Sequence, residues 1–515
     1  MLISTLIEDA KILSDDDEVG LQHIAKAVID RLQSERPSHP AVVVGLEQEL
    51  IALYKRMCHP LKHAVEQHFG GLPANGLAQW MKGQLGRCSV LDRALHEQSR
   101  QLISEFIVVE HRYALDKLEL RTRGLLVGDS ELVSTRIASA DKHHGQHVLK
   151  LGFSGQPAVY YKPRPGSGAQ LLADVSNLLS HWGLHLGAAK ILVRDGYHWM
   201  AEVPYHAALD NESARRFAFN GGVLYAVAHA LNASDLHFEN IIASLDGPVV
   251  VDCETLSQPR FSEPAAAYLL KRPREEHDDV TSLFLNFDHY GGQDIDYGGL
   301  SCVDFVFRAD PNAGLQIALS SERRQLVKHS SRSAVEVDGR RIAPAVEYFE
   351  AFIQGVRRAS AVLTERKDEL LKLIPPTSTF RVPLRATRVY AALLAERMSA
   401  ICFSSYAANA WHSHLELDLF DAPPEFLSAA RSIFEQEAID LGVLDIPAAY
   451  VRADSRDLLL RDAVVQGVFD LSPLEVIRRR LSTLSDAGVE DQVATLRARL
   501  AKSLERRTAR GEVGA

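Results

Sequence analysis

One stretch of the chain, Asp235-Leu-His-Phe-Glu-Asn240, constrains the fold and the chemistry more than any other. The apolar periodicity of residues 211–230 predicts a helix that ends just before this stretch. After it, two short apolar runs divided by Asp246-Gly247 predict a β-hairpin that ends at Asp252. We therefore expect a helix, a loop, a hairpin and an acid in that order, with polar side chains at Asp235, Asn240 and Asp252.

This order is typical of the catalytic core of a kinase. In that core a loop aspartate accepts the proton of the hydroxyl, an asparagine five residues later binds Mg²⁺, and an aspartate after the hairpin binds the metal that bridges the phosphates. Asp235, Asn240 and Asp252 stand at these three places. Each residue alone is explained more simply as a polar loop residue or a cap. Their joint order and spacing favour the kinase interpretation.

A lysine on a predicted strand precedes this core. Alternating residues at 148–153 and 158–162, around Ser154-Gly155, predict a hairpin that carries Lys162. A predicted helix at 169–181 and a second hairpin at 190–203 follow, which is the order of a kinase small lobe, where a strand lysine grips the α- and β-phosphates. By itself Lys162 is more simply a surface lysine, but its place upstream of Asp235 favours the catalytic interpretation.

Several features depart from an ordinary protein kinase. No G-x-G-x-x-G pattern precedes Lys162, and Asp141-Lys-His-His-Gly145 stands there instead. Ala233-Ser234 replaces the His-Arg pair before the catalytic aspartate, and Asp252-Cys-Glu254 replaces Asp-Phe-Gly. The predicted helix after Lys162 contains no glutamate, so the partner of Lys162 is left open.

Taken together, these motifs resemble the dehydratase domain of type II lanthipeptide synthetases. The stretches that carry the resemblance are Asp141-x-His143, Tyr161-Lys-Pro-Arg164, Asp235-Leu-His-Phe-Glu-Asn240, Val249-Val-Val-Asp-Cys-Glu-Thr-Leu256, Phe380-Arg-Val-Pro-Leu-Arg-Ala-Thr-Arg-Val-Tyr390 and Leu444-Asp-Ile-Pro447. It covers the catalytic and C-terminal parts well and the first hundred residues only loosely. The resemblance implies a lipid-kinase-like domain that uses ATP and Mg²⁺ to phosphorylate Ser and Thr in the core of a leader-bearing precursor peptide. Elimination of the phosphate then leaves dehydroalanine or dehydrobutyrine.

The resemblance also implies roles for individual residues. It places Asn240 and Asp252 at the metal, Asp141, His143, Lys162 and Glu254 at the nucleotide, Lys162, Asp235 and His237 in phosphoryl transfer, and Arg381 and Thr387 in elimination. Elimination needs a base for the α-proton, which stays unassigned, and donors on the departing phosphate. Without the resemblance, Arg381 would be a surface arginine, Thr387 a helix cap and His237 a loop histidine.

We predict an α+β protein with a lipid-kinase-like, two-lobed catalytic core. The predicted units are a helical module at 1–124, a small lobe at 125–207 and a large lobe at 208–515, which contains a polar insertion at 257–345 and a helical part at 375–515. In the module, helices are predicted at 19–33, 41–57, 77–85 and 89–123, broken at Pro37, Pro40, Pro60 and Pro73. The insertion is either an analogue of an activation loop or a long surface insertion, with a hairpin at 335–342. Long helices are predicted after it at 346–373, 387–403, 425–441 and 490–506.

Composition excludes other classes of protein. With 57 basic and 67 acidic residues the net charge is −10, which argues against nucleic-acid binding. No apolar run reaches membrane-spanning length and the first residues do not form a signal peptide, so we predict a cytoplasmic protein. The five cysteines form no C-x-x-C pair, so neither disulfides nor the zinc cyclase site of the synthetases is expected. A stand-alone dehydratase, as in proteusin pathways, or an isolated domain would then act with a separate cyclase or another maturation enzyme.

Two functions of other classes stay open. A small-molecule kinase of the aminoglycoside or fructosamine type carries a similar Asp-Leu-His-x-x-Asn loop, but it would release a stable phosphorylated product and give Arg381 and Thr387 no role. A pseudokinase scaffold would bind peptide without turnover. The scaffold is disfavoured because the lysine, the base and both metal ligands are present in the sequence.

Overall fold

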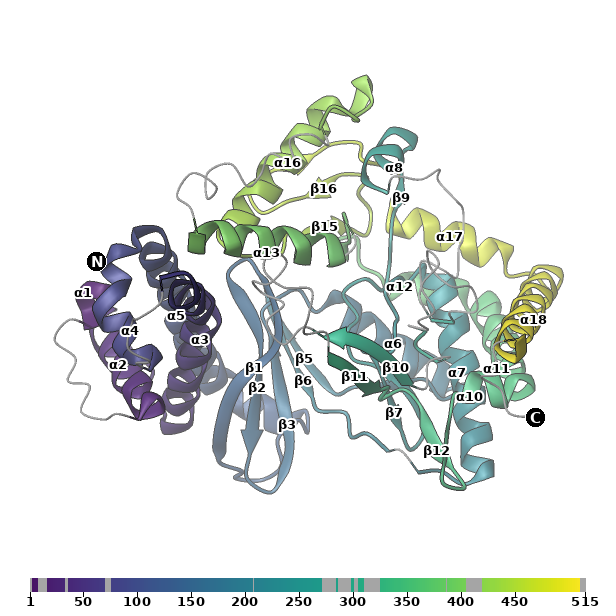
Figure 1. Ribbon diagram of the computed structural model, residues 1–515. Coiled ribbons are helices and arrows are strands. Elements are labelled where there is room, and N and C mark those ends of the chain that lie inside the picture. The colour runs from purple at the N-terminus through teal and green to yellow at the C-terminus, as the bar shows by residue number, and fades with distance from the viewer. Residues whose placement is uncertain are drawn as a thin grey trace.

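The computed structural model describes residues 2–7, 16–32, 36–69, 76–206, 208–270, 284–285, 298–300, 304–309, 325–385, 387–403 and 419–509. Helices and several small sheets make up an α+β protein, as the sequence predicts. Figure 1 shows the N-terminal helices on one side of a central antiparallel sheet and the larger helical part on its other side. None of the helices in the described ranges has both the length and the apolar character needed to cross a membrane.

The N-terminal helices pack on one another and on the central sheet. They are α1 (Ile3–Ile7), α2 (Asp17–Leu32), α3 (Pro40–Phe69), α4 (Leu77–Gln84), the 3-10 turn η1 (Leu85–Arg87) and α5 (Ser89–Thr122). Their apolar faces form one core with Leu149, Tyr161 and Trp199 of the sheet. The prediction of a break at Pro60 is wrong, because α3 runs through it. A proline removes a single helical hydrogen bond, and the neighbouring Met57 and Leu61 are buried, so tertiary packing keeps the helix continuous.

The central sheet has the order β1-β2-β3-β6-β5, with antiparallel pairing throughout. Its strands are β1 (Leu132–His143), β2 (Gln146–Phe153), β3 (Gln156–Lys162), β5 (Ile191–Arg194) and β6 (Tyr197–Ala201). The two predicted hairpins are confirmed. The sequence pattern does not predict β1, because a register shift between Ile137 and Lys142 breaks the alternation expected of a strand. β1 turns into β2 at His144-Gly145, both with positive φ, as two-residue hairpin turns require.

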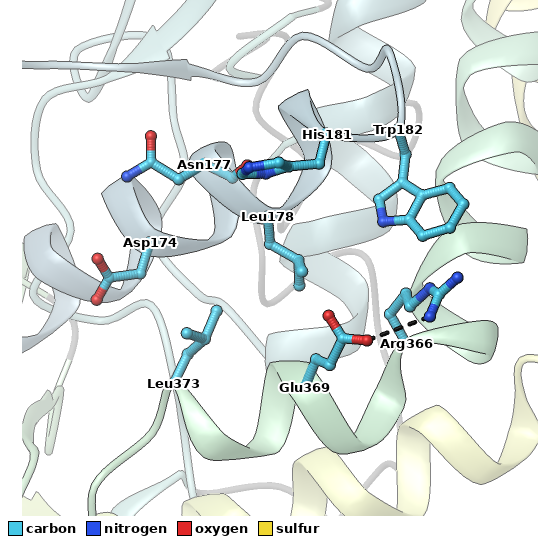
Figure 2. A pocket seen from close by; sticks show the side chains of 8 residues that line it. All are labelled: Asp174, Asn177, Leu178, His181, Trp182, Arg366, Glu369 and Leu373. Carbon is cyan, nitrogen blue, oxygen red and sulfur yellow. Dashed lines mark hydrogen bonds and ion pairs between the residues drawn. The ribbon is translucent and has the colours of Figure 1, made fainter.

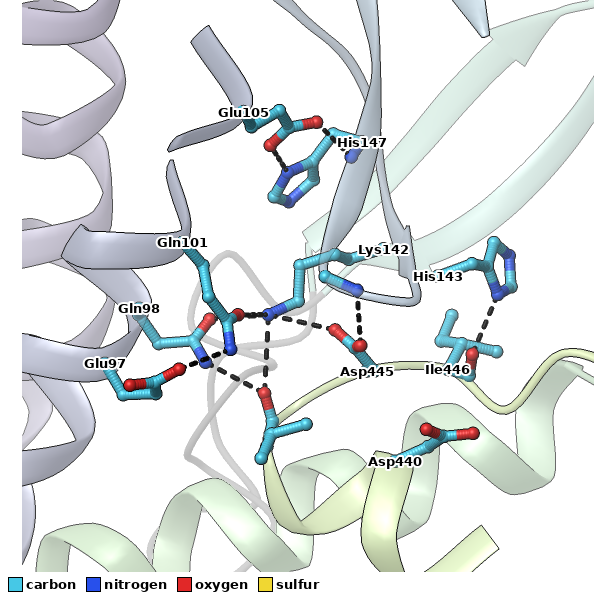
Figure 3. Close-up of polar contacts among 12 residues, drawn as sticks. Glu97, Gln98, Gln101, Glu105, Lys142, His143, His147, Asp440, Asp445 and Ile446 are labelled. Atoms are coloured by element: carbon cyan, nitrogen blue, oxygen red, sulfur yellow. Dashed lines mark hydrogen bonds and ion pairs between the residues drawn. The ribbon is translucent and has the colours of Figure 1, made fainter. Parts of the chain in front are cut away.

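The tip of the β1–β2 hairpin is held between α5 and a C-terminal segment at 443–446 (Figure 3). The buried Lys142 side chain donates from Nζ to Oε1 of Gln98 (2.8 Å) and Oε1 of Gln101 (3.0 Å) and forms an ion pair with Oδ1 of Asp445 (3.0 Å). The backbone N–H of Gly145 donates to Oδ2 of Asp445, at 2.5 Å. The N-terminal helices and the C-terminal part are thus joined through the same hairpin.

A long helix, α7 (Asn211–Leu231), precedes the Asp235 loop as predicted. Asp210 caps its N-terminus by accepting from the Ser213 N–H, and Asn232 ends it in the left-handed conformation. α7 packs so closely on α11 (Phe349–Glu365) that a Cβ on Gly222 would lie 1.9 Å from the Phe352 carbonyl oxygen. Only glycine permits this approach. α6 (Ser167–Ser180) and a three-stranded sheet of β4 (Gly187–Ala188), β7 (Ile241–Ser244) and β8 (Gly247–Val250) complete the surroundings of α7.

The C-terminal part contains more strands than the sequence predicts. A four-stranded sheet comprises β14 (Thr379–Val382), β15 (Ala449–Arg452), β16 (Leu458–Leu459) and β17 (Val464–Val465). The part at 375–515, predicted as helical, thus contains strands beside its helices, and the sequence does not predict them because short strands paired over long sequence distances give no clear periodicity. β14 ends shortly before α13 (Thr387–Phe403), a helix predicted with these bounds.

The remaining elements surround these units. They are β9 (Arg260–Phe261), α8 (Glu263–Leu269), β10 (Asp304–Ala309), β11 (Gln325–Ser330), β12 (Val335–Val337), β13 (Arg340–Ile342), α10 (Pro344–Glu347), α12 (Lys367–Lys372), η3 (Pro424–Phe426), α16 (Leu427–Gly442), β18 (Phe469–Leu471), α17 (Pro473–Thr483) and α18 (Asp486–Ala509). The predicted hairpin at 335–342 is confirmed as β12 and β13. Part of the polar insertion, including 271–279 and Gly291-Gly292, lies outside the described residues, as do Pro73 and the tail beyond Ala509.

Candidate active site

The loop after α7 has the geometry of a preorganised polar site. Asp235 has a φ of 60°, a left-handed conformation that is uncommon outside glycine, asparagine and aspartate. The Asn240 side chain donates from Nδ2 to the backbone oxygen of Asp235 (2.8 Å), and the Asn240 N–H donates to the oxygen of His237 (3.0 Å). Because the amide nitrogen is held by a carbonyl, the amide oxygen of Asn240 points the other way, as a cation ligand requires.

Backbone and hydroxyl contacts hold this loop against the segment that carries Asp252. The Ser234 N–H donates to the Thr255 oxygen (3.0 Å), and the Thr255 hydroxyl donates to the Ser234 oxygen (2.7 Å). Burial raises the pKa of the Asp235 carboxyl, and the negative charge of Asp252 raises it further. The charge of His237 acts in the opposite direction, but the net effect is a raised pKa. A carboxylate with a raised pKa is a better proton acceptor at neutral pH.

Lys162 lies on β3 and is almost fully buried. Its Nζ donates to the carbonyl oxygen of Val251 at 2.7 Å, so the partner left open by the sequence is the residue directly before Asp252. Burial raises the pKa of Asp252, but the charges of Lys162 and Arg164 outweigh it and hold that pKa well below its usual range. Within the described part of the chain no ion pair shorter than 4 Å includes Asp252. The ionised carboxylate is therefore available to a cation.

Glu254 joins two arginines from distant parts of the chain. Arg164 pairs with its Oε1, and Nη1 of Arg381 lies 3.5 Å from its Oε2. The Arg381 N–H also donates to the Glu254 carbonyl oxygen at 2.9 Å, so β14 is docked on the segment that follows Asp252. We call Lys162, Arg164, Asp252, Glu254 and Arg381 the Glu254 cluster. In it Glu254 is an anchor for both guanidinium groups.

The other predicted residues, His143, Asp141 and Thr387, differ in burial and in their position relative to the cluster. His143 is buried, with Nδ1 2.8 Å from the Ile446 oxygen, and burial together with the Arg381 charge lowers its pKa well below the ordinary value. It is a neutral imidazole beside the cluster. Asp141 is exposed in the irregular part of β1 and faces solvent. Thr387 is the first residue of α13, and its side chain lies outside the described part.

Two residues of the site, Arg164 in the cluster and Tyr450 at its edge, have no role predicted from the sequence. Arg164 belongs to the motif Tyr161-Lys-Pro-Arg164, and its position two residues after Lys162 was the available signal that it shares the site. Tyr450 lies directly opposite Arg381 in the β14–β15 pair. No local pattern marks Tyr450, because its position follows from a strand pairing between distant segments.

The chemistry of the loop fits a nucleotide-bound magnesium ion. Mg²⁺ prefers carboxylate and amide oxygens and usually keeps only one or two protein ligands beside phosphate and water. Asn240 and Asp252 supply two such oxygens. Among the described residues, no group of three or more His, Cys, Asp or Glu side chains is placed to hold a metal ion. A magnesium ion at this site would depend on nucleotide phosphates to complete its coordination.

A groove of about 490 Å³ lies elsewhere, between α6 and α12 (Figure 2). Its tryptophan, Trp182, is covered by the guanidinium of Arg366, 3.9 Å from the ring centroid, and Arg366 also pairs with Glu369 at 3.2 Å. The groove contains none of the residues predicted for catalysis. We therefore place the candidate active site at the Glu254 cluster and the Asp235 loop.

The chain belongs to the family described as a domain of unknown function (DUF4135), whose model matches residues 89–452 and so includes the whole Glu254 cluster. It is also similar to the lacticin 481/lactococcin biosynthesis protein LcnDR2 of Lactococcus lactis subsp. lactis, with 21% identity over 406 residues. That alignment covers 72% of this chain and 42% of the relative, so the chain spans less than half of the relative's length. At the level of the family, the comparisons agree with a relation to lanthipeptide synthetases.

Proposed function

We propose that this protein dehydrates Ser and Thr residues in a ribosomally made precursor peptide, first by phosphorylating the hydroxyl and then by eliminating the phosphate. One observation carries the proposal. Arg381, to which the resemblance gives a role in elimination, contacts Glu254, which lies beside the residues that the resemblance places in phosphorylation. A kinase that releases a phosphorylated product has no need of this arginine at the same site. The name of LcnDR2 supports a peptide natural product as the end point.

In the first step Asp235 would accept the proton of the Ser or Thr hydroxyl, whose oxygen attacks the terminal phosphorus of ATP while the bond from that phosphorus to ADP breaks and ADP leaves. ATP with Mg²⁺ supplies the phosphoryl group and neutralises its charge. Asn240 and Asp252 would hold the metal, and Lys162, on a rigid strand beside Asp252, would orient the phosphates.

In the second step a base removes the α-proton, the Cα=Cβ bond forms and the Cβ–O bond breaks, so that its electron pair leaves on the phosphate. Negative charge grows on the departing oxygen, and fixed donors there lower the barrier. Arg381 would be one of these donors because its guanidinium fork matches phosphate. Arg164 would meanwhile keep Glu254 neutralised.

The test is to incubate the purified protein with the precursor peptide encoded near its gene, together with ATP and Mg²⁺, and to weigh the product. We expect a peptide lighter by one water per modified residue, and no change without ATP or Mg²⁺. A product that stays heavier by phosphate would favour a kinase. Phosphorylation of an aminoglycoside or a sugar amine, but not of the peptide, would favour the small-molecule kinase. Peptide binding without turnover would favour the scaffold.

Variants of the elimination residues separate the two steps. Arg381→Ala and Thr387→Ala should accumulate phosphopeptide, because losing one donor to a developing anion slows elimination by roughly a hundredfold. The backbone contact of Arg381 to Glu254 does not need its side chain, so phosphorylation should continue. Arg452→Ala on the neighbouring strand is a control for losing one arginine, since its half-exposed side chain lies 3.8 Å from Asp454. If both variants stop before phosphorylation, the assignment of Arg381 and Thr387 to elimination is wrong.

A further inference from the structure

Tyr450 is placed by three separate elements at the edge of the Glu254 cluster. It lies on β15 directly opposite Arg381 on β14, where paired residues have Cβ atoms about 5 Å apart. Its ring meets the His144 ring edge-on, with centroids 6.3 Å apart, at the turn of the β1–β2 hairpin. Electrostatically it is coupled to Glu254, Arg164 and Arg381. The side chain therefore lies among the charges of the candidate site.

The protonation state of Tyr450 decides what its hydroxyl can do. Burial raises the pKa of this phenol to about 12, the Glu254 charge adds to the rise and the arginines oppose it. At neutral pH the hydroxyl keeps its proton, so it can donate a hydrogen bond but cannot serve as the base that removes an α-proton. Within the described part of the chain, no other group forms a hydrogen bond with this hydroxyl. Its donor is free for a ligand.

The two arginines differ in their freedom to contact that ligand. The Arg164 side chain is 10% exposed and pairs with Glu254 directly, whereas Arg381 is 20% exposed and its Nη1 lies 3.5 Å from the same carboxylate. A phosphate with two negative charges would attract Arg381 away from Glu254 more readily than Arg164. An anion held by Arg381 would then lie next to the residue across the strand pair, Tyr450.

We infer that Tyr450 is a further catalytic residue of the elimination step, donating a hydrogen bond from its hydroxyl to the departing phosphate beside Arg381. This inference rests on the proposed function. The electron pair of the breaking Cβ–O bond passes to the phosphate oxygen, and the Tyr450 O–H stabilises that charge without giving up its proton. The α-proton goes to a separate base, so tyrosine is not consumed or oxidised. The chemical class of the ligand is a phosphate monoester of a peptide Ser or Thr.

The experiment compares Tyr450→Phe with wild type in the two steps separately. The elimination probe is the precursor peptide synthesised with one phosphoserine in its core, supplied with ADP and Mg²⁺. We expect elimination to slow by roughly a hundredfold, as for loss of one donor to a developing oxyanion. Phosphorylation of the unmodified peptide with ATP should stay within about twofold. Tyr160→Phe is the control for losing one tyrosine hydroxyl, because the centroid of the Tyr160 ring on β3 lies 5.4 Å from Nζ of Lys150 and Tyr160 is not a member of the Glu254 cluster.

Each result bears on the inference. Selective loss of elimination in Tyr450→Phe, with Tyr160→Phe like wild type, supports it. Equal elimination by Tyr450→Phe and wild type overturns it, and so does a matching loss of phosphorylation, which would mark Tyr450 as a structural residue. If wild type itself fails to convert the phosphopeptide, the proposed function fails and the inference falls with it. That failure is told apart because it appears in wild type before any variant is compared.

Discussion

In the part of the chain that the structure describes, two buried ion clusters connect the central sheet to the C-terminal part, and they are built differently. Around Lys142, the cation is surrounded by the Asp445 carboxylate and the amide oxygens of Gln98 and Gln101, and the Lys142 and Asp445 side chains are 6% and 1% exposed. In the Glu254 cluster, two arginines share one carboxylate, while Lys162 donates to a backbone carbonyl.

This difference separates a structural cluster from a reactive one. A buried charge is tolerated when partners pair with it, and buried Lys142 has a direct ion pair with Asp445 and donates to two amide oxygens. The Glu254 cluster leaves the ionised Asp252 without a direct ion-pair partner among the described residues, and it holds one arginine more loosely than the other. Such incomplete pairing stabilises the protein little but leaves charges ready for a metal and a phosphate. Mutations should therefore cost stability at the first cluster and activity at the second.

The largest effect on stability is expected for Lys142→Met. Removing the cation leaves Asp445 buried with Arg461 as its remaining cationic partner, at 3.0 Å. Breaking one side of a buried pair typically costs about 3–5 kcal/mol, and we expect the lower end because Arg461 stays. Urea denaturation should show this loss as a lower midpoint. Lys55→Met is the control, since its pair with Glu18 has half-exposed side chains and should contribute less than about 1 kcal/mol.

An opposite result at Lys142 would overturn the comparison. If Lys142→Met kept the urea midpoint of wild type and yet lost dehydration, the Lys142 cluster would belong to the reactive class. Hydrogen exchange of the β1–β2 amides offers a second readout, because loosening of the hairpin tip would raise exchange there before the whole protein unfolds.

The next effect concerns activity in the Asp235 loop. Under the proposed function, Asp235→Asn and Lys162→Ala should each lower phosphorylation of the precursor peptide by about a hundredfold or more, since proton acceptance or phosphate positioning is lost. Asp235→Asn keeps the size and shape of the side chain, so we expect it to change the free energy of unfolding by less than about 1 kcal/mol. Mass spectrometry of the peptide and urea denaturation of the variant measure the two quantities. Near-normal phosphopeptide formation by both variants would show that the loop has another role.

The sequence predicted the parts of the fold whose signals are local. Helical periodicity identified α7 and α13, and turn residues identified the β2–β3 hairpin, because each pattern reports which face of a single element is buried. Elements defined by distant partners were missed. β1 contains a register shift, and β14 and β15 are four residues long and pair across a wide sequence separation. A short strand has too few residues for its alternation to be distinguished from chance.

The residues of the candidate site also divide into those that a local motif predicts and those whose position depends on contacts between distant segments. The order of Lys162, Asp235, Asn240 and Asp252 follows one continuous stretch of elements, so the sequence motif was sufficient to group them. The contact of Arg381 with Glu254 brings together residues that the linear order suggested were remote. The sharing of Glu254 by Arg164 and Arg381, and the place of Tyr450, depend on how β14 docks and pairs. Such contacts become visible only once the chain is folded.

The smallest expected effect tests whether nearby cations fully compensate the buried carboxylates around Lys142. Beside it on α16, Asp440 pairs with Arg461 at 3.1 Å, yet burial raises its pKa to about 6. The unfolded value is near 4, so the folded state binds this proton more tightly. The resulting stability is fully present below about pH 4 and is lost as pH rises through about 6. Since Arg461 and solvent screening offset part of the cost, we expect a change of about 1 kcal/mol.

Asp440→Asn should remove this pH dependence, because the amide resembles the protonated acid and does not titrate. Urea denaturation of both proteins at several pH values between 4 and 7 measures the difference in their unfolding free energies, which should shift by about 1 kcal/mol in favour of the variant as pH rises. Asp454→Asn makes the same change at a half-exposed side chain and controls for the loss of one charge. A constant difference between wild type and Asp440→Asn would mean that Arg461 compensates Asp440 completely. The Lys142 region would then be balanced at each of its carboxylates, which would make its contrast with the Glu254 cluster sharper.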